Sequence, residues 1–239
     1  LKEKRNDVIL ATKAGNHWEK GKEGWYWDPS KDYIKRAAKD SLKRMGTDYI
    51  DLFQLHGGTI DDPVDETIEA FEELKQEGLI REYGISSIRP NVIREYVSRS
   101  NIVSVMMQYS ILDRRPEETA LPLLEENNIS VIARGSVAKG MLSDKAADKT
   151  PENGFLDYSK EEVLDVANEI QNMANENRNA SQIALRYALS HPAVAAVIPG
   201  ASRLEQLIEN IGATDVELTA DEIESIRHLS KANVYDKHR

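Results

Sequence analysis

Cysteine is missing from this chain of 239 residues, and long apolar stretches are missing as well. The lack of cysteine excludes a disulfide scaffold, a thiolate zinc site and a cysteine nucleophile. It is also consistent with a reducing compartment, so we expect a cytoplasmic protein. No stretch approaches the ~18 consecutive apolar residues of a membrane-spanning helix. No apolar signal-peptide core follows the first seven residues either, so we expect neither a membrane anchor nor a secretory signal.

Basic residues are also in short supply. The chain has 31 Lys+Arg against 41 Asp+Glu, which gives a formal net charge of −10. Because nucleic-acid phosphates are bound mainly by lysine and arginine, this balance argues against nucleic acid as a partner. The hydrophobic content of 40% is enough for a sizeable core. We predict a small-molecule substrate and no metal cofactor, and we leave the oligomeric state open.

Short β-rich runs alternate with amphipathic segments along the chain. Apolar residues at helical spacing predict a helix over 31–45, with Ser30 as its N-cap and Gly46 as its stop. Pro63 is expected to open the next helix. The predicted strands are 8–12, 49–55, 80–85, 102–107, 129–133 and 193–198. Further helices are predicted near 63–79, 90–99, 117–127, 160–175, 180–190, 203–211 and 219–230.

This alternation predicts an α/β protein with a parallel sheet. Six strands suit a doubly wound sheet, or a (β/α)8 TIM-type barrel lacking its first two βα units, about 60 residues. No G-x-G-x-x-G motif follows any strand, so the fingerprint of a Rossmann fold is missing. No linker composition interrupts the chain, so residues 1–239 are predicted to be one domain. Residues 139–159 have few large apolar anchors, and we expect a mobile loop there.

A polar residue that could take part in catalysis or ligand binding follows each of the first five apolar runs. In chain order these are Lys13, His56, Ser86, Gln108 and Arg134, and the last run leads into the turn Pro199-Gly200. Each one alone is compatible with an ordinary strand terminus. In a parallel barrel, however, the carboxyl ends of the strands converge on one face, where active sites form. Together these residues therefore predict a polar ring over an apolar barrel.

Four motifs, in order, resemble the aldo-keto reductase superfamily. They are the central signature GTDYIDLFQLH at 46–56, the catalytic-lysine strand ATKAG at 11–15, GLIREYGISS at 78–87, and the cofactor-closing segment IPGASRLEQLIEN at 198–210. The resemblance extends over roughly residues 7 to 230.

The resemblance implies a (β/α)8 barrel that binds NADP(H) across the strand ends and reduces an aldehyde or ketone by hydride transfer. In that family a tyrosine donates the proton, a lysine lowers the pKa of that tyrosine, a histidine orients the carbonyl and an aspartate pairs with the lysine. Lys13 and His56 match the lysine and the histidine. The tyrosine and the aspartate belong to the first two βα units, so we expect them upstream of Leu1 and expect the barrel to be N-terminally incomplete here.

The resemblance also assigns NADPH-binding residues. Ser86 and Gln108 match the residues that hold the nicotinamide carboxamide, whereas Ser87 replaces the family's asparagine. Arg134 stands where an aromatic ring usually stacks on the nicotinamide, and its planar guanidinium can stack too. The pyrophosphate is expected at Gly135, Ser136, Val137 and Lys139, and the adenosine end at Gly200, Ser202, Arg203, Gln206, Glu209 and Asn210. Ser202 and Arg203 near a helix start favour NADPH over NADH.

Three tryptophans follow the Lys13 strand. Trp18, Trp25 and Trp27 lie in a polar, glycine-containing stretch that is a poor strand and a poor helix. They can pack over the barrel rim, or they can line the substrate pocket and suit an apolar or aromatic carbonyl. We assign them to the substrate pocket.

Two other functions remain open. The first is a catalytically weak, NADPH-binding regulatory or scaffold protein on the same barrel. The second is a barrel enzyme that uses Lys13 as a Schiff-base nucleophile, which would have no use for the segment 200–210.

Overall fold

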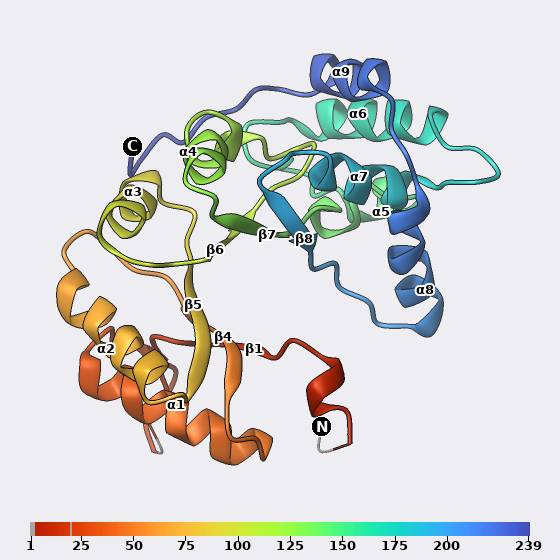
Figure 1. The fold of residues 1–239 in the computed structure, drawn as a ribbon. Coiled ribbons are helices and arrows are strands. Elements are labelled where there is room, and N and C mark those ends of the chain that lie inside the picture. Colours follow the sequence, from red (N-terminus) through yellow and green to blue (C-terminus); the bar gives the residue numbers. More distant parts are fainter. Residues whose placement is uncertain (1–2, 20) are drawn as a thin grey trace. The chain divides into compact units, whose positions relative to one another are not determined.

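The computed structural model describes residues 3–19 and 21–239, in which strands alternate with helices (Figure 1). The strands are β1 (Ala11–Ala14), β2 (Asn16–His17), β3 (Tyr26–Trp27), β4 (Ile50–Leu55), β5 (Ile80–Ser86), β6 (Ser104–Gln108), β7 (Ser130–Arg134) and β8 (Val194–Val197). The α-helices are α1 (Lys31–Met45), α2 (Val64–Gln76), α3 (Pro90–Arg99), α4 (Ala120–Glu126), α5 (Ala146–Lys149), α6 (Lys160–Asn172), α7 (Ala180–Leu189), α8 (Leu204–Gly212) and α9 (Ala220–Leu229). The 3-10 turns are η1 (Arg5–Asp7), η2 (Arg115–Glu117), η3 (Ala138–Gly140) and η4 (Ala213–Asp215). None of the helices in the described ranges is long and apolar enough to cross a membrane.

The main sheet follows the chain, in the order β1-β4-β5-β6-β7-β8. The pairs β1–β4, β4–β5, β5–β6 and β7–β8 are parallel. Parallel strands in sequential order, joined by helices, are the arrangement of a β/α barrel sheet. The predicted α/β class is therefore confirmed. Strands β1 and β8 stand at the two ends of this order, so the described strands form an open sheet.

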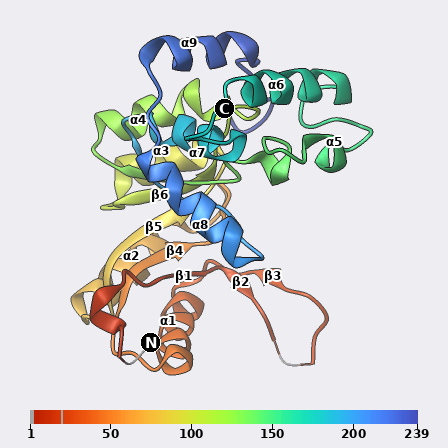
Figure 2. The same cartoon turned by 90° about the vertical axis from the view of Figure 1, so that its right-hand side faces the viewer.

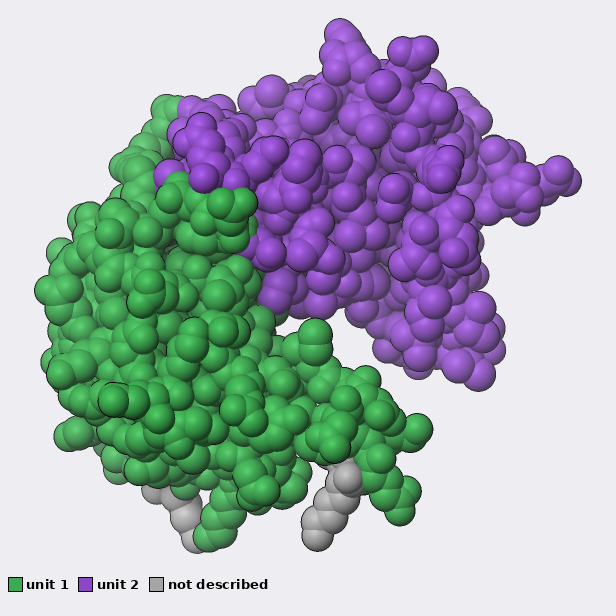
Figure 3. Space-filling model, viewed as in Figure 1, with its two compact units in different colours: residues 1–106, 127–129, 237–239 green, residues 107–126, 130–236 purple. Residues whose placement is uncertain are grey.

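The chain divides into two compact units (Figure 3). Unit 1 comprises Leu1–Met106, Asn127–Ile129 and Lys237–Arg239, and it contains β1 to β5, α1 to α3 and the start of β6. Unit 2 comprises Met107–Glu126 and Ser130–Asp236, and it contains the end of β6, β7, β8 and the helices from α4 to α9.

Helix α1 of unit 1 has the limits that its sequence predicts. The Ser30 side chain accepts a hydrogen bond from the backbone amide of Tyr33, 3.3 Å away, and so caps the first turn. Gly46 ends the helix with φ 64°, a left-handed conformation that glycine adopts without steric cost. The predicted N-cap and stop are both confirmed.

The core of unit 1 lies between its strands and the helices that follow them. The Phe71 ring of α2 lies 5.5 Å from the Phe53 ring of β4 and 5.3 Å from the Tyr83 ring of β5, measured between centroids. All three side chains are essentially buried. Because side chains alternate across a strand, Gln54 of β4 faces the side opposite to Phe53, together with Ile50 and Leu52.

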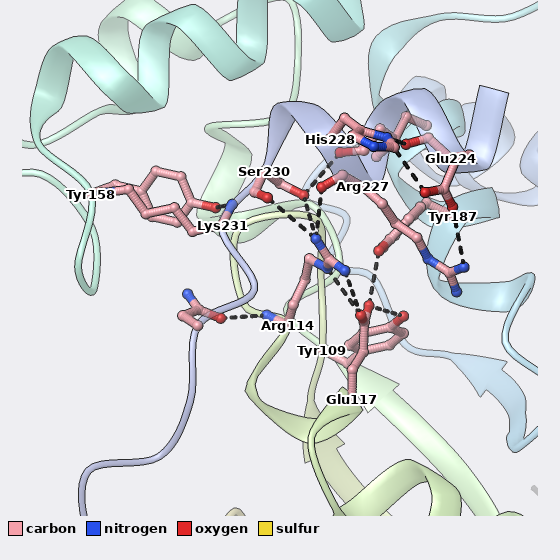
Figure 4. Close-up of polar contacts among 12 residues, drawn as sticks. Tyr109, Arg114, Glu117, Tyr158, Tyr187, Glu224, Arg227, His228, Ser230 and Lys231 are labelled. Atoms are coloured by element: carbon pink, nitrogen blue, oxygen red, sulfur yellow. Dashed lines mark hydrogen bonds and ion pairs between the residues drawn. The ribbon is translucent and has the colours of Figure 1, made fainter. Parts of the chain in front are cut away.

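A partly buried carboxylate, that of Glu117, lies at the centre of a hydrogen-bond network in unit 2 (Figure 4). Oε1 of Glu117 accepts hydrogen bonds from the hydroxyls of Tyr109 and Tyr187, each 2.9 Å long, and Oε2 accepts from Nε and Nη2 of Arg114 at 3.0 and 2.8 Å. Arg114 also donates from Nη1 to the carbonyl oxygen of Ser230, 3.2 Å away, just past α9. Burial alone would raise the pKa of Glu117, but its bonds to Arg114 and the two phenols outweigh burial and hold the pKa below its ordinary value.

Two details near the N-terminus differ from the sequence predictions. The first strand begins at Ala11 rather than at residue 8, and Ile9 is 84% exposed, because the chain joins β4 only from Leu10 onward. The prediction that the tryptophan-rich stretch forms no strand is also wrong at its end. Tyr26 and Trp27 pair antiparallel with Asn16 and His17, as β3 with β2. Lys20, inside this stretch, lies outside the described residues.

The segment 139–159 is better anchored than its sequence suggests. It contains the short helix α5, and the side chains of Met141 and Leu142 are completely buried, while Tyr158 is 3% exposed. The few large apolar residues of its first half therefore do anchor it. Residues 151–153 and 156–157 are exposed, and the mobility of the segment stays a prediction.

Candidate active site

Lys13 and His56 lie at the carboxyl ends of two neighbouring strands of unit 1. Lys13 of β1 is in register with Gln54 of β4, and the backbone amide of His56 donates to the carbonyl oxygen of Ala14 at 2.7 Å. The parallel pairing therefore brings the two predicted catalytic residues to the same edge of the sheet. Lys13 is half-buried and His56 is exposed, with its Nδ1 3.3 Å from Nδ2 of Asn16.

Gln54 is a polar residue of this edge that the sequence analysis overlooked. Its side chain is fully buried, and within residues 3–19 and 21–239 neither its amide nitrogen nor its oxygen has a hydrogen-bond partner. A buried amide without a partner is costly, so such groups are rare in native proteins. The available signal was a glutamine inside the otherwise apolar end of the run IDLFQL.

Of the three tryptophans, Trp27 is the one that the structure packs against the Lys13 and His56 segments. Its indole covers the backbone of Gly15 and Gly57, because a Cβ built on either glycine would lie 3.4 Å or less from Cζ3 of the ring. Trp18 and Trp25 are 68% and 55% exposed, in the stretch that projects beyond β2 and β3 (Figure 2).

Ser86 ends strand β5, also in unit 1. It is half-buried, and it is in register with Met106 of β6. The next residue, Ser87, is buried, and its hydroxyl accepts a hydrogen bond from the amide of Arg89, 3.1 Å away, at the start of α3. Ser87 therefore has a local structural role, which is in line with its departure from the family's asparagine.

Gln108 and Arg134 meet in unit 2. Nη1 of Arg134 donates to Oε1 of Gln108 at 3.1 Å, and the amide of Tyr109 donates to the carbonyl oxygen of Arg134 at 3.2 Å. Gly135 lies against the same glutamine, because a Cβ built on it would be 3.4 Å from Cγ of Gln108. The structure thus brings three of the predicted cofactor residues together.

The turn after Arg134 is strained, and it contains an unsatisfied polar atom. Ala138 and Lys139 have φ values of 47° and 57°, which cost energy for residues with a Cβ. The hydroxyl of Ser136 is buried without a hydrogen-bond partner among the described residues. Backbone strain and a buried hydroxyl without a partner are both features that occur in ligand-binding segments. These residues, with Val137, therefore fit a bound phosphate group.

The predicted adenosine segment is exposed and leads into α8. The backbone amide and the hydroxyl of Ser202 both donate to Oε1 of Gln206, at 2.9 and 3.0 Å. Nδ2 of Asn210 lies 3.4 Å from the carbonyl oxygen of Gly200. These two donors point at one acceptor oxygen. A phosphate oxygen could replace Oε1 of Gln206 as that acceptor.

Two further residues of this segment were predicted to bind the adenosine end. Arg203 is exposed at the start of α8. Glu209 is exposed, and its backbone carbonyl accepts from Nε2 of Gln182 in α7, 3.0 Å away. The side chains of both are thus accessible to a ligand.

Comparison with known proteins places this arrangement in context. Residues 1–231 match the model of the Aldo/keto reductase family. The chain is similar to the "Uncharacterized oxidoreductase YqkF" of Bacillus subtilis (strain 168), with 59% identity over 244 residues, 100% of this chain and 79% of the relative. It is 28% identical over 247 residues to the "NADH-specific methylglyoxal reductase" of Escherichia coli (strain K12), covering 95% of this chain and 76% of the relative.

The fold has a close counterpart among solved structures. The holo form of aldo-keto reductase AKR11C1 from Bacillus halodurans matches with a TM-score of 0.91 and 58% identity, over 100% of this chain and 78% of that chain. This likeness confirms the barrel-type β/α fold predicted from the sequence.

Proposed function

The chain belongs to the aldo/keto reductase family of oxidoreductases, and we propose that it reduces aldehydes or ketones to alcohols with NADPH as the hydride donor. The observation that carries this proposal is the placement of Lys13 and His56 at one edge of the sheet, with Ser86 at the same end of the next strand. A lysine and a histidine at parallel strand ends are suited to polarise a carbonyl oxygen.

The chain's own residues hold the carbonyl and stabilise its developing charge. When bound, the nicotinamide supplies the hydride that adds to the carbonyl carbon. His56 is exposed at the strand end and donates a hydrogen bond to the carbonyl oxygen. The ammonium group of Lys13 stabilises the negative charge that develops on that oxygen. The proton donor implied by the family resemblance is a tyrosine, and it is not among the residues matched here.

Three groups of residues would hold the cofactor. Ser86, Gln108 and Arg134 would meet the nicotinamide, and the existing bond between Gln108 and Arg134 supports a shared role. The strained turn of Gly135, Ser136, Val137 and Lys139 would meet the pyrophosphate. The adenosine end falls to Gly200, Ser202, Arg203, Gln206, Glu209 and Asn210.

The choice of NADPH over NADH rests on residues rather than on the family, since one relative is an NADH-specific reductase. The two Ser202 donors that now share the Gln206 oxygen offer a position for the 2′-phosphate, and the guanidinium of Arg203 adds positive charge beside it.

The substrate wall is proposed at Trp27. Its indole is half-buried beside the residues that follow Lys13 and His56, and such a flat surface suits an apolar or aromatic carbonyl. For the exposed Trp18 and Trp25, contact with substrate stays a prediction, as does the cytoplasmic location.

Consumption of NADPH with a generic aldehyde tests the proposal. We expect turnover by the wild-type protein and a loss of kcat of about 100-fold in Lys13→Met, because the positive charge that stabilises the oxyanion is removed. Lys43→Met, an exposed lysine of α1, is the matched control and is expected to retain activity. NADPH binding without turnover in the wild type would instead support the scaffold alternative. Borohydride trapping of a carbonyl on Lys13 without nicotinamide binding would support a Schiff-base enzyme.

A further inference from the structure

One indole ring packs against the two chain segments that carry the proposed catalytic residues. A Cβ built on Gly15 would lie only 2.4 Å from Cζ3 of Trp27, and one on Gly57 would lie 3.4 Å from the same atom. Gly15 is two residues past Lys13, and Gly57 directly follows His56. The ring of Trp27 therefore rests on the backbone of both segments at once, and we call this contact the Trp27 clamp.

A carboxylate fixes the clamp in place. Nε1 of Trp27 donates to Oδ1 and Oδ2 of Asp62, at 3.0 and 3.1 Å. The same carboxylate accepts from the backbone amide of Thr59 at 2.7 Å and from its hydroxyl at 3.2 Å. Asp62 thus joins β3, which carries the ring, to the turn that follows His56. Hydrogen bonds to an ionised acceptor are stronger than neutral ones, and this carboxylate is only partly exposed.

The backbone at the clamp favours glycine. Gly15 has φ 129° and Gly57 has φ 132°, in the positive region that residues with a Cβ rarely adopt. The amide of Asp28, next to Trp27, donates to the carbonyl oxygen of Gly15 at 2.8 Å and closes the other side of the contact. The Asp62 carboxylate thus holds the ring itself, the Asp28 amide fixes the backbone beside it, and the two glycines leave space for the indole.

We propose that Asp62 is a positioning residue of this protein, and that it sets the Lys13 and His56 segments against each other through the Trp27 ring. The inference rests on the proposed carbonyl reduction. Asp62 touches neither substrate nor cofactor in this account, and its effect reaches the reacting carbonyl through the clamp. Small displacements of catalytic groups are costly, so loosening the ring is expected to lower kcat while leaving cofactor affinity unchanged.

The tryptophan content of the chain makes the clamp directly observable. The chain has three tryptophans. Trp18 and Trp25 are both largely exposed, so changing both to phenylalanine leaves Trp27 as the single fluorescent reporter with little change in packing. In this background we would compare Asp62→Ala with Asp62→Asn, which keeps one acceptor oxygen for the indole. Asp61→Ala, an exposed neighbour in the same loop, is the matched control.

We expect Asp62→Ala to shift Trp27 emission to longer wavelength, to increase its quenching by acrylamide, and to lower kcat about tenfold with an unchanged Kd for NADPH. Asp62→Asn should recover most of both signals, and Asp61→Ala should match the parent. Parent-like emission or parent-like kcat in Asp62→Ala would overturn the proposal. So would a kcat loss in Asp62→Asn as large as that in Asp62→Ala despite parent-like emission. If the wild-type protein reduces no carbonyl at all, the proposed function fails, and the emission comparison still decides whether Asp62 holds the ring.

Discussion

The segments around Lys13 and His56 are held by contacts between distant parts of the sequence, whereas the segment from Gly200 to Asn210 is held largely by its own residues. In the first region Asp62 bonds an indole 35 positions away. In the second, Ser202 bonds Gln206 four positions away, and α8 buries none of its residues. A hydrogen bond from Nε2 of Gln182 to the backbone carbonyl of Glu209 links this segment to α7.

This difference has a functional meaning. Groups that stabilise a transition state work best when they are fixed before the reaction, since no reorganisation is then needed. A segment that must release its ligand in every cycle can instead be only marginally ordered. We therefore interpret the segments around Lys13 and His56 as preorganised, and the segment 200–210 as one that becomes ordered when the ligand binds.

The largest effect is expected at Glu117, whose carboxylate accepts hydrogen bonds from Tyr109, Arg114 and Tyr187 in unit 2. Glu117→Gln leaves the charge of the buried Arg114 uncompensated and is expected to lower the free energy of unfolding by about 3 kcal/mol at neutral pH. Chemical denaturation measures the loss, and Glu126→Gln, an exposed glutamate of α4, is the control. The cofactor affinity of the folded variant should be unchanged. That result would show that Glu117 contributes to stability, whereas the segment 200–210 contributes to cofactor binding.

The pH dependence of that loss follows from the pKa of Glu117, which is lowered in the folded state. The stability that the carboxylate contributes is fully present above its unfolded pKa, near 4.5, and is lost as the pH falls through the lower folded value. The gap between the wild type and Glu117→Gln should therefore narrow in acid. A gap that is constant from neutral to acidic pH would show that the charge of Glu117 contributes little.

A smaller effect is expected from Arg203→Ala at the start of α8. Loss of this exposed guanidinium should raise KM for NADPH about fivefold and leave KM for NADH unchanged, because only NADPH has the 2′-phosphate. Steady-state kinetics with both cofactors measures the split. Arg94→Ala, an exposed arginine of α3, is the control and should change neither value. Equal effects on the two cofactors would contradict the assignment of the phosphate position.

The smallest effect is expected in the segment 139–159. Its first half is anchored by Met141 and Leu142, so cofactor-dependent ordering should be confined to residues 151–157, most of which are exposed. Hydrogen exchange followed by mass spectrometry, with and without NADPH, would show slower exchange in that stretch alone. Identical exchange with and without NADPH would show that this stretch is an ordinary surface loop that does not respond to the cofactor.

Much of the fold could be predicted because it depends on local pattern. The limits of α1 follow from Ser30 and Gly46, and the strands follow from short β-rich runs. The Trp27 clamp could not be predicted, since nothing in the sequence near Trp27 indicates that Asp62 lies beside it. The Glu117 centre was missed for the same reason, because Tyr187 lies 70 positions away. Contacts of this kind depend on how elements pack, which local periodicity does not encode.

The same reasoning explains why the candidate site was predicted only in part. Lys13 and His56 were identifiable because the end of a strand is visible in the sequence, and parallel pairing then brings them together. The unpartnered amide of Gln54 was not identifiable, since a glutamine within an apolar run looks like any interruption of the pattern.

The most direct test of the account is the kinetics of the His56→Ala variant, with NADPH and a generic aldehyde. His56 is placed to orient the carbonyl and does not hold the cofactor. We therefore predict that kcat falls about 100-fold, while the Kd for NADPH, followed by quenching of tryptophan fluorescence, stays the same. An unchanged kcat would contradict the central claim that the ends of β1 and β4 form the catalytic edge.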